Sequence, residues 1–134
     1  MLVPATRYQD CARALRFPTD VVGMEETVVV RDDVGAIVHA ELRLGEGLFM
    51  FGPEVDNDFV RYMVAPRDAG RRETTTIYAI VADVQNHHAR AAAAGAEIIQ
   101  PLREESYGGW AYGLRDAEGH IWSFGSYDPR HQQL

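Results

Sequence analysis

The sequence predicts an α+β fold built from two similar halves, each running strand, helix and then three strands. Segments rich in β-branched residues alternate with helical segments, and three landmarks recur at a spacing of 72 or 73 residues. These landmarks are the pairs Asp10 and Asp83, Gly23 and Gly95, and Leu42 and Leu114. A chain of 134 residues fits one domain. We therefore expect a single duplicated domain over 1–134, divided into a first module at 1–52, a linker at 53–73, a second module at 74–127 and a tail at 128–134.

The first half begins with a short strand and a helix. Asp10 is expected to cap the helix, Pro18 to kink or end it, and Gly23 to close the region. The expected strands cover 2–8, 25–31, 36–44 and 48–52, with a turn at 32–35 and a hairpin around 45–47. The linker is predicted from its two Pro residues, its charges and Gly70.

The second half repeats this order. Asp83 is expected to cap a helix that ends at Gly95, and His87 and His88 on this helix are expected to face solvent. Cys11, the sole cysteine, is expected to be an ordinary helix residue of the first half. The expected strands of the second half cover 74–82, 96–102, 110–115 and 120–125, with a polar loop at 104–109 and a turn at 116–119.

The composition excludes several classes of protein. The net charge of −7 argues against a nucleic-acid-binding protein, which would present a basic face. All 13 basic residues are Arg, so no Lys is present to form a Schiff base or to bind a phosphate in a P-loop. Neither a signal peptide nor an apolar run of membrane-spanning length is visible. We therefore expect a cytoplasmic protein with neither nucleic acid nor membrane as a partner.

Several motifs together resemble one known family. They are Asp83-Val84 at the start of the Ala-rich helix, Ala94-Gly95-Ala96-Glu97-Ile98, Tyr107-Gly108-Gly109, the segment RDAEGHIWSFG at 115–125, and His39-Ala40-Glu41-Leu42-Arg43-Leu44-Gly45. The chain resembles the glyoxalase/bleomycin resistance/extradiol dioxygenase group, the vicinal oxygen chelate superfamily, and its glyoxalase-like branch in particular. This resemblance implies two βαβββ modules whose mixed sheets curl into a U-shaped cup with helices outside, and often a homodimer.

The resemblance also implies a divalent metal in the cup of the family's enzymes, held by the first and fourth strands of each module. The family's ligand positions correspond to Val3, Phe51, Thr76 and Ser123 in this sequence. None of these four is a good ligand for Zn, Fe, Mn or Ni. We therefore expect no metal and no other cofactor.

Strand alternation predicts which side chains would face the cup. If Arg43 opposes Leu48, His39 and Glu41 point away from the cup, unless a bulge turns them toward it. In the second hairpin, Ser123 is expected to oppose Tyr112. The predicted ligand-binding residues, which give an apolar and aromatic pocket, are Arg7, Phe49, Phe51, Thr76, Tyr78, Trp110, Tyr112 and Ser123.

Three functions fit this pattern. The favoured hypothesis is a metal-free protein that binds a small molecule, for which the acidic net charge suits a cationic or aromatic guest. The second is a superfamily enzyme, namely a lyase, isomerase or dioxygenase, with a relocated metal site or metal-free acid–base chemistry. In that case Glu41 is the best candidate residue, because no catalytic arrangement is evident elsewhere. The third is a partner-binding module whose cup is filled by its own aromatic side chains.

Overall fold

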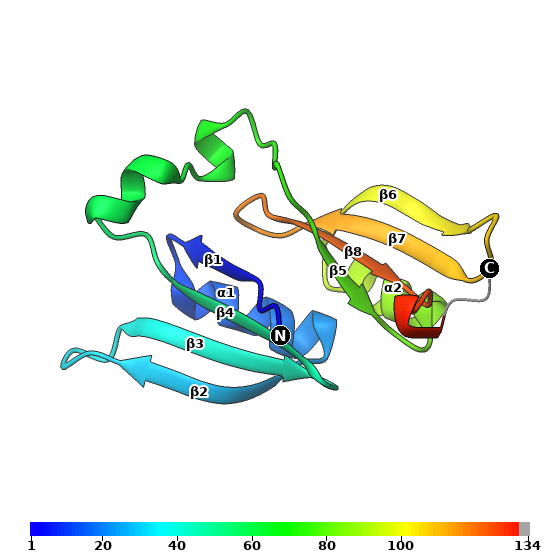
Figure 1. The fold of residues 1–134 in the computed structure, drawn as a ribbon, viewed down its shortest axis with the longest axis horizontal. Coiled ribbons are helices and arrows are strands. Elements are labelled where there is room, and N and C mark those ends of the chain that lie inside the picture. The colour runs from blue at the N-terminus through cyan, green and yellow to red at the C-terminus, as the bar shows by residue number, and fades with distance from the viewer. Residues whose placement is uncertain (132–134) are drawn as a thin grey trace. The chain divides into compact units, whose positions relative to one another are not determined.

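The computed structural model describes residues 1–131 and divides the chain into two compact units. Unit 1 is Met1–Arg71, and unit 2 begins at Arg72. Each unit contains a four-stranded mixed sheet and one α-helix that lies against it (Figure 1). The predicted α+β fold with two βαβββ modules is therefore confirmed. Residues 132–134 of the predicted tail lie outside the described residues.

Unit 1 has the strand order β1-β4-β3-β2, in which β1 is parallel to β4 and the other neighbours are antiparallel. Its elements are β1 (Ala5–Tyr8), α1 (Cys11–Phe17), the π-helical turn η1 (Pro18–Val22), β2 (Glu25–Arg31), β3 (Ile37–Leu44) and β4 (Gly47–Pro53). The Asp10 carboxylate accepts a hydrogen bond from the backbone N of Arg13 at 3.0 Å, so Asp10 caps α1 as predicted. Pro18 changes the α-helix into a wider turn, which ends at Gly23 with a φ of 91°.

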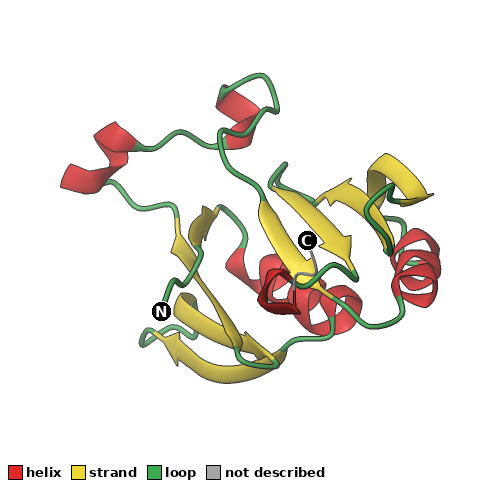
Figure 2. Ribbon diagram, turned by 45° about the vertical axis from the view of Figure 1, so that its right-hand side comes forward, coloured by secondary structure: helices red, strands yellow, loops and turns green. Residues whose placement is uncertain are grey.

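The segment after β4 is not irregular throughout. It contains the 3-10 helices η2 (Asp58–Tyr62) and η3 (Pro66–Asp68), which are separate short turns in Figure 2. The side chain of Asn57 caps the first of them by accepting a hydrogen bond from the backbone N of Phe59 at 3.1 Å. Pro66 begins the second, where its fixed φ suits the first turn of a helix. Compact local turns thus replace the unstructured linker that composition alone would suggest.

Unit 2 repeats the topology, with the strand order β5-β8-β7-β6 and β5 parallel to β8. Its elements are β5 (Ile77–Ile80), α2 (Val84–Ala93), β6 (Glu97–Glu104), β7 (Trp110–Arg115), β8 (Ile121–Gly125) and the 3-10 turn η4 (Pro129–His131). Asp83 caps α2 by accepting a hydrogen bond from the backbone N of Asn86 at 3.0 Å. Among residues 1–131, no helix has the length and apolar character needed to cross a membrane.

The turns of the β3–β4 and β7–β8 hairpins differ by one residue in length. Leu44 pairs with Gly47 across a two-residue turn in unit 1. In unit 2 the backbone N of Asp116 donates to the carbonyl of His120, which encloses three residues. The predicted register of β3 and β4 is confirmed, because Arg43 pairs with Leu48. The predicted register of β7 and β8 was wrong by one residue.

The register of β7 and β8 determines the core of unit 2. Tyr112 pairs with Phe124, and Leu114 pairs with Trp122; all four side chains are buried. His87 of α2 is also buried, with its ring centroid 4.5 Å from that of Phe124 and its Nδ1 2.6 Å from the Tyr112 hydroxyl. The expectation that His87 faces solvent was wrong, because its imidazole finds a polar partner within the core.

Candidate functional site

In unit 1, one face of the sheet packs toward α1 and the other does not. We call them the helix face and the open face. Ala40, Leu42, Phe49 and Phe51 lie on the helix face, with at most 2% of each side chain exposed. Ala5 pairs with Met50 and Arg7 with Gly52, and these four residues lie on the open face. The prediction that the rings of Phe49 and Phe51 face away from the helix was wrong, because the strand buries its largest apolar side chains against α1. Phe51 nevertheless contributes to the lining of the pocket described below.

His39 and Glu41 also lie on the open face of unit 1. Glu41 pairs with Met50, and the β2–β3 register shifts by one residue near Val38. This bulge leaves Val38 exposed although Ile37 is buried. The expectation that His39 and Glu41 point away from the binding face was wrong. The predicted register of β3 and β4 was correct, but the wrong face of this hairpin was expected to pack against α1.

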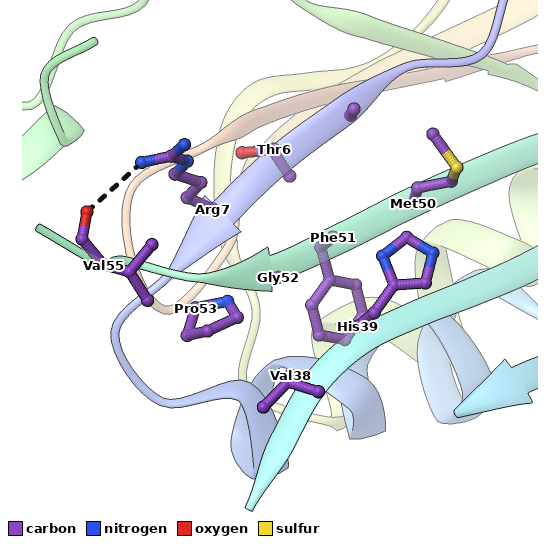
Figure 3. Close-up of a pocket in the computed structure, with 10 residues that line it drawn as sticks. Thr6, Arg7, Val38, His39, Met50, Phe51, Gly52, Pro53 and Val55 are labelled. Atoms are coloured by element: carbon purple, nitrogen blue, oxygen red, sulfur yellow. Dashed lines mark hydrogen bonds between the residues drawn. The ribbon is translucent and has the colours of Figure 1, made fainter. Parts of the chain in front are cut away.

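A pocket of about 340 Å³ opens on this face of unit 1. Figure 3 shows that its lining comes from β1, from β4 and from the bulge of β3. The residues that line it are Ala5, Thr6, Arg7, Val38, His39, Met50, Phe51, Gly52, Pro53 and Val55. Gly52 forms part of the pocket wall and has no side chain to fill the space above it. A Cβ at this position would lie 3.3 Å from the carbonyl oxygen of Val38, a tight contact. The volume of the pocket is within the range of sites for small organic molecules.

Two polar groups border the pocket. The Arg7 guanidinium donates to the Val55 carbonyl oxygen at 3.5 Å and lies 5.5 Å from the ring centroid of Phe59, which orients it at one end (Figure 3). Nε2 of His39 lies 2.8 Å from Oε2 of Glu41, and both side chains are more than a third exposed. The site is therefore mainly apolar, with one guanidinium and one imidazole–carboxylate pair.

Unit 2 presents an open face of its own. Tyr78 pairs with Ser123 and Ile80 with Gly125 on this face, whereas Ala79 pairs with Phe124 on the helix face. The predicted positions of Tyr78 and Ser123 are thus on the open face, and Thr76 is exposed just before β5. Tyr112 lies on the helix face because of the shifted register, and strand alternation places Trp110 there too. The prediction that Trp110 and Tyr112 line a binding face was wrong.

The four residues that the resemblance assigns to the family's metal positions, Val3, Phe51, Thr76 and Ser123, carry no imidazole or carboxylate. The neighbouring open-face pairs do not fit a metal either. The open-face pairs of the first and fourth strands are Ala5 with Met50 and Tyr78 with Ser123. They offer a methyl group, a thioether and two hydroxyls, in place of the imidazoles and carboxylates that bind divalent cations. Throughout residues 1–131, no three His, Cys, Asp or Glu side chains gather in an arrangement that could hold a metal ion.

Two βαβββ units, each with a mixed sheet that buries one face and leaves the other open, define a duplicated α+β protein, and the open face of unit 1 carries a pocket. The chain belongs to the glyoxalase/bleomycin resistance protein/dioxygenase superfamily, whose family model matches residues 4–124. This match reaches into both units and includes the pocket of unit 1 as well as Tyr78 and Ser123 on the open face of unit 2.

Individual relatives agree with this assignment. The crystal structure of TioX from Micromonospora sp. ML1 is 31% identical, covers 98% of this chain and 99% of its own, and has a TM-score of 0.73. An uncharacterized protein of Mycobacterium bovis is 28% identical over 124 residues, which are 92% of this chain and 81% of that protein. The fosfomycin resistance protein FosX from Mesorhizobium loti shares the fold at 13% identity and a TM-score of 0.66, covering 97% of this chain and 93% of its own.

Proposed function

We propose that this protein binds a small organic molecule on its open faces and works without a resident metal ion. The observation that carries the proposal is that the open-face pairs of Ala5 with Met50 and of Tyr78 with Ser123 offer no imidazole or carboxylate, next to a pocket of about 340 Å³ in unit 1. Apolar side chains with a few polar groups suit reversible binding of an organic guest. The protein would then sequester a drug or metabolite and release it chemically unchanged.

The chemistry of the chain favours a basic or aromatic guest. The net charge of −7 attracts cations from solution. Arg7 is the exception within the pocket of unit 1, where its guanidinium would bind an oxygen or an acidic group of the same molecule. We therefore expect an aromatic cation that carries at least one hydrogen-bond acceptor.

A library of cationic aromatic compounds tests the proposal through ligand-induced shifts in Tm. We expect at least one compound to stabilise the protein in proportion to its concentration, and to be recovered unchanged. Ala5→Tyr should remove this stabilisation, because a ring at position 5 would occupy the space above Gly52. Elemental analysis should show no stoichiometric Zn, Ni, Fe or Mn. One equivalent of tightly held metal, or no stabilisation by any compound, would contradict the proposal.

A second candidate, metal-free acid–base catalysis, is favoured by the pair of His39 and Glu41. His39 lines the pocket, and its contact with Glu41 would orient the imidazole for proton transfer. The test is turnover of any compound found to bind, in the wild type and in His39→Gln. If this candidate is correct, His39→Gln should retain binding and lose turnover. Binding with no product formed by the wild type would rule it out.

We also propose that the protein is a cytoplasmic homodimer in which the two units form one domain. The segment that follows β4 in the sequence supports association of two chains, because it presents several exposed apolar side chains. They are Val55, Phe59, Val60, Tyr62, Met63 and Val64. Sedimentation equilibrium should give twice the chain mass of 15.0 kDa. A monomer at all concentrations would contradict the dimer.

A further inference from the structure

The two units place different residues at matching positions of their open faces. Ala5, Met50 and Gly52 in unit 1 correspond to Tyr78, Ser123 and Gly125 in unit 2, because each strand pair has the same parallel register 73 residues later. In unit 1 the small Ala5 side chain leaves the space above Gly52 open, and both residues line the pocket. In unit 2 the same space is covered by the ring of Tyr78.

Gly125 is what allows the Tyr78 ring to lie close to the backbone of β8. A Cβ at position 125 would lie 2.5 Å from the Tyr78 hydroxyl oxygen and 3.1 Å from two of its ring carbons. The hydroxyl of Tyr78 donates to the Tyr127 carbonyl oxygen at 2.8 Å, which fixes the outer end of the ring. Partial burial is the main cause that raises the pKa of Tyr78 above its ordinary value, and the nearby Tyr107 adds to it. Even so, 44% of Tyr78 is exposed. The ring is therefore held in place and still accessible.

Two further tyrosines extend this surface. The rings of Tyr107 and Tyr127 meet edge to face, with centroids 5.4 Å apart. The loop that carries Tyr107 is closed by hydrogen bonds in both directions between Glu105 and the two glycines that follow Tyr107. It is also bound to the strand end, because the Ser126 hydroxyl accepts a hydrogen bond from the backbone N of Trp110 at 3.0 Å. Tyr107 is 65% exposed, so the loop fixes a second accessible ring.

We propose that Tyr78, Tyr107 and Tyr127 form a stacking surface for a planar, positively charged aromatic molecule. This inference rests on the proposed function and names the chemistry of the second open face. Tyrosine ring faces carry negative electrostatic potential and attract aromatic cations, and the net charge of −7 acts in the same direction. Fixing the rings before binding reduces the entropy lost on binding.

Isothermal titration with 9-aminoacridine, a planar aromatic cation, tests the stacking surface. We expect Tyr78→Ala and Tyr107→Ala each to raise its Kd by about tenfold. Tyr78→Phe keeps the ring and should bind within about threefold of the wild type. Val34→Ala is the control, since Val34 is 88% exposed in the turn before β3 of unit 1 and belongs to neither open face. Its Kd should not change, and cyclohexylammonium, a cation without an aromatic ring, should bind none of these proteins measurably.

The outcomes separate this inference from the proposed function. Circular dichroism must first show that each variant is folded, and Tyr107→Ala provides a second route if Tyr78→Ala does not fold. An unchanged Kd in folded Tyr78→Ala and Tyr107→Ala would overturn the stacking surface, and so would a wild type that does not bind 9-aminoacridine. If Ala5→Tyr nevertheless abolishes stabilisation by a library compound, the proposed function survives without this inference. If no compound binds, both fail.

Discussion

Asp116 uses both carboxylate oxygens to hold the turn between β7 and β8. Oδ1 accepts hydrogen bonds from the backbone N of Glu118 and of His120, each at 3.0 Å. Oδ2 accepts a hydrogen bond from Nε1 of the buried Trp122 at 3.2 Å. Asp32 makes the same two backbone contacts in the turn before β3, but it is exposed and no tryptophan follows it. Comparing Asp116 with Asp32 therefore separates the contribution of the turn from that of the hydrogen bond to the buried Trp122.

We predict that Asp116→Ala lowers the free energy of unfolding by about 2–4 kcal/mol, and Asp32→Ala by about 1 kcal/mol. The difference arises because Asp116→Ala also removes the acceptor of a buried indole N–H. Urea unfolding of the two variants beside the wild type measures both changes. Equal losses would show that Trp122 gains nothing from the carboxylate.

The buried Tyr112 predicts how stability depends on pH in the alkaline range. Burial raises the pKa of Tyr112 above its ordinary value, because the phenolate would lose hydration in the core. The native state therefore keeps this proton at a pH at which the unfolded chain releases it. Stability from this group is complete below about pH 10, and is lost as the pH rises beyond that value.

We predict that the wild type loses more stability than Tyr112→Phe between about pH 9 and about pH 11. The variant should be less stable at neutral pH, by about 1–2 kcal/mol, because His87 loses its hydrogen-bond partner. Urea unfolding at a series of pH values gives both quantities. Parallel pH profiles for the two proteins would contradict the assignment to Tyr112.

At the scale of elements, Gly125 and Tyr78 act as a pair across β5 and β8. Gly125→Ala should displace the Tyr78 ring and cost about 1–3 kcal/mol, because the new Cβ would overlap its hydroxyl oxygen. The cost should largely disappear in a Tyr78→Ala background, where the space is empty. A double-mutant cycle on the free energy of unfolding measures this coupling. Additive effects would show that the two residues do not compete for the same space.

Local chemistry predicted the elements better than their faces. Asp10 and Asp83 indicate where the helices begin, because a cap acts within one turn. Runs of β-branched residues indicate the strands. The register of β3 and β4 was also correct. Sequence alternation shows which residues share a face, but not which face meets the helix. Phe49 and Phe51 were therefore placed on the wrong side, although their size and apolarity are a signal that could have corrected this.

The candidate site was predictable only in part. Arg7, Tyr78 and Ser123 lie on open faces as expected, since the first strand of each unit follows simple alternation. The pocket exists because Ala5 and Gly52 have little or no side chain. We expected large side chains to face a ligand, so a site formed by small ones was not predicted. The bulge at Val38, which leaves this side chain exposed and part of the pocket lining, has no local sequence signal.

At the scale of the whole molecule, each unit contains its own buried aromatic or aliphatic core. If no structural metal contributes, dialysis against a chelator should leave the Tm unchanged in a calorimetric scan. The control is the same scan after Zn or Mn is added back. A Tm that falls on chelation and recovers with metal would reveal a stabilising site that the donor set does not suggest.

The extra turn residue between β7 and β8 bears on how the halves of a duplicated gene can be recombined. An exchange of complete hairpins between the halves would keep each strand beside its proper partner. A crossover within the turn would shift one strand by one residue and send its apolar side chains to the solvent side. Chimeric chains, whether made by evolution or in the laboratory, should therefore be joined outside these turns, at the ends of whole hairpins.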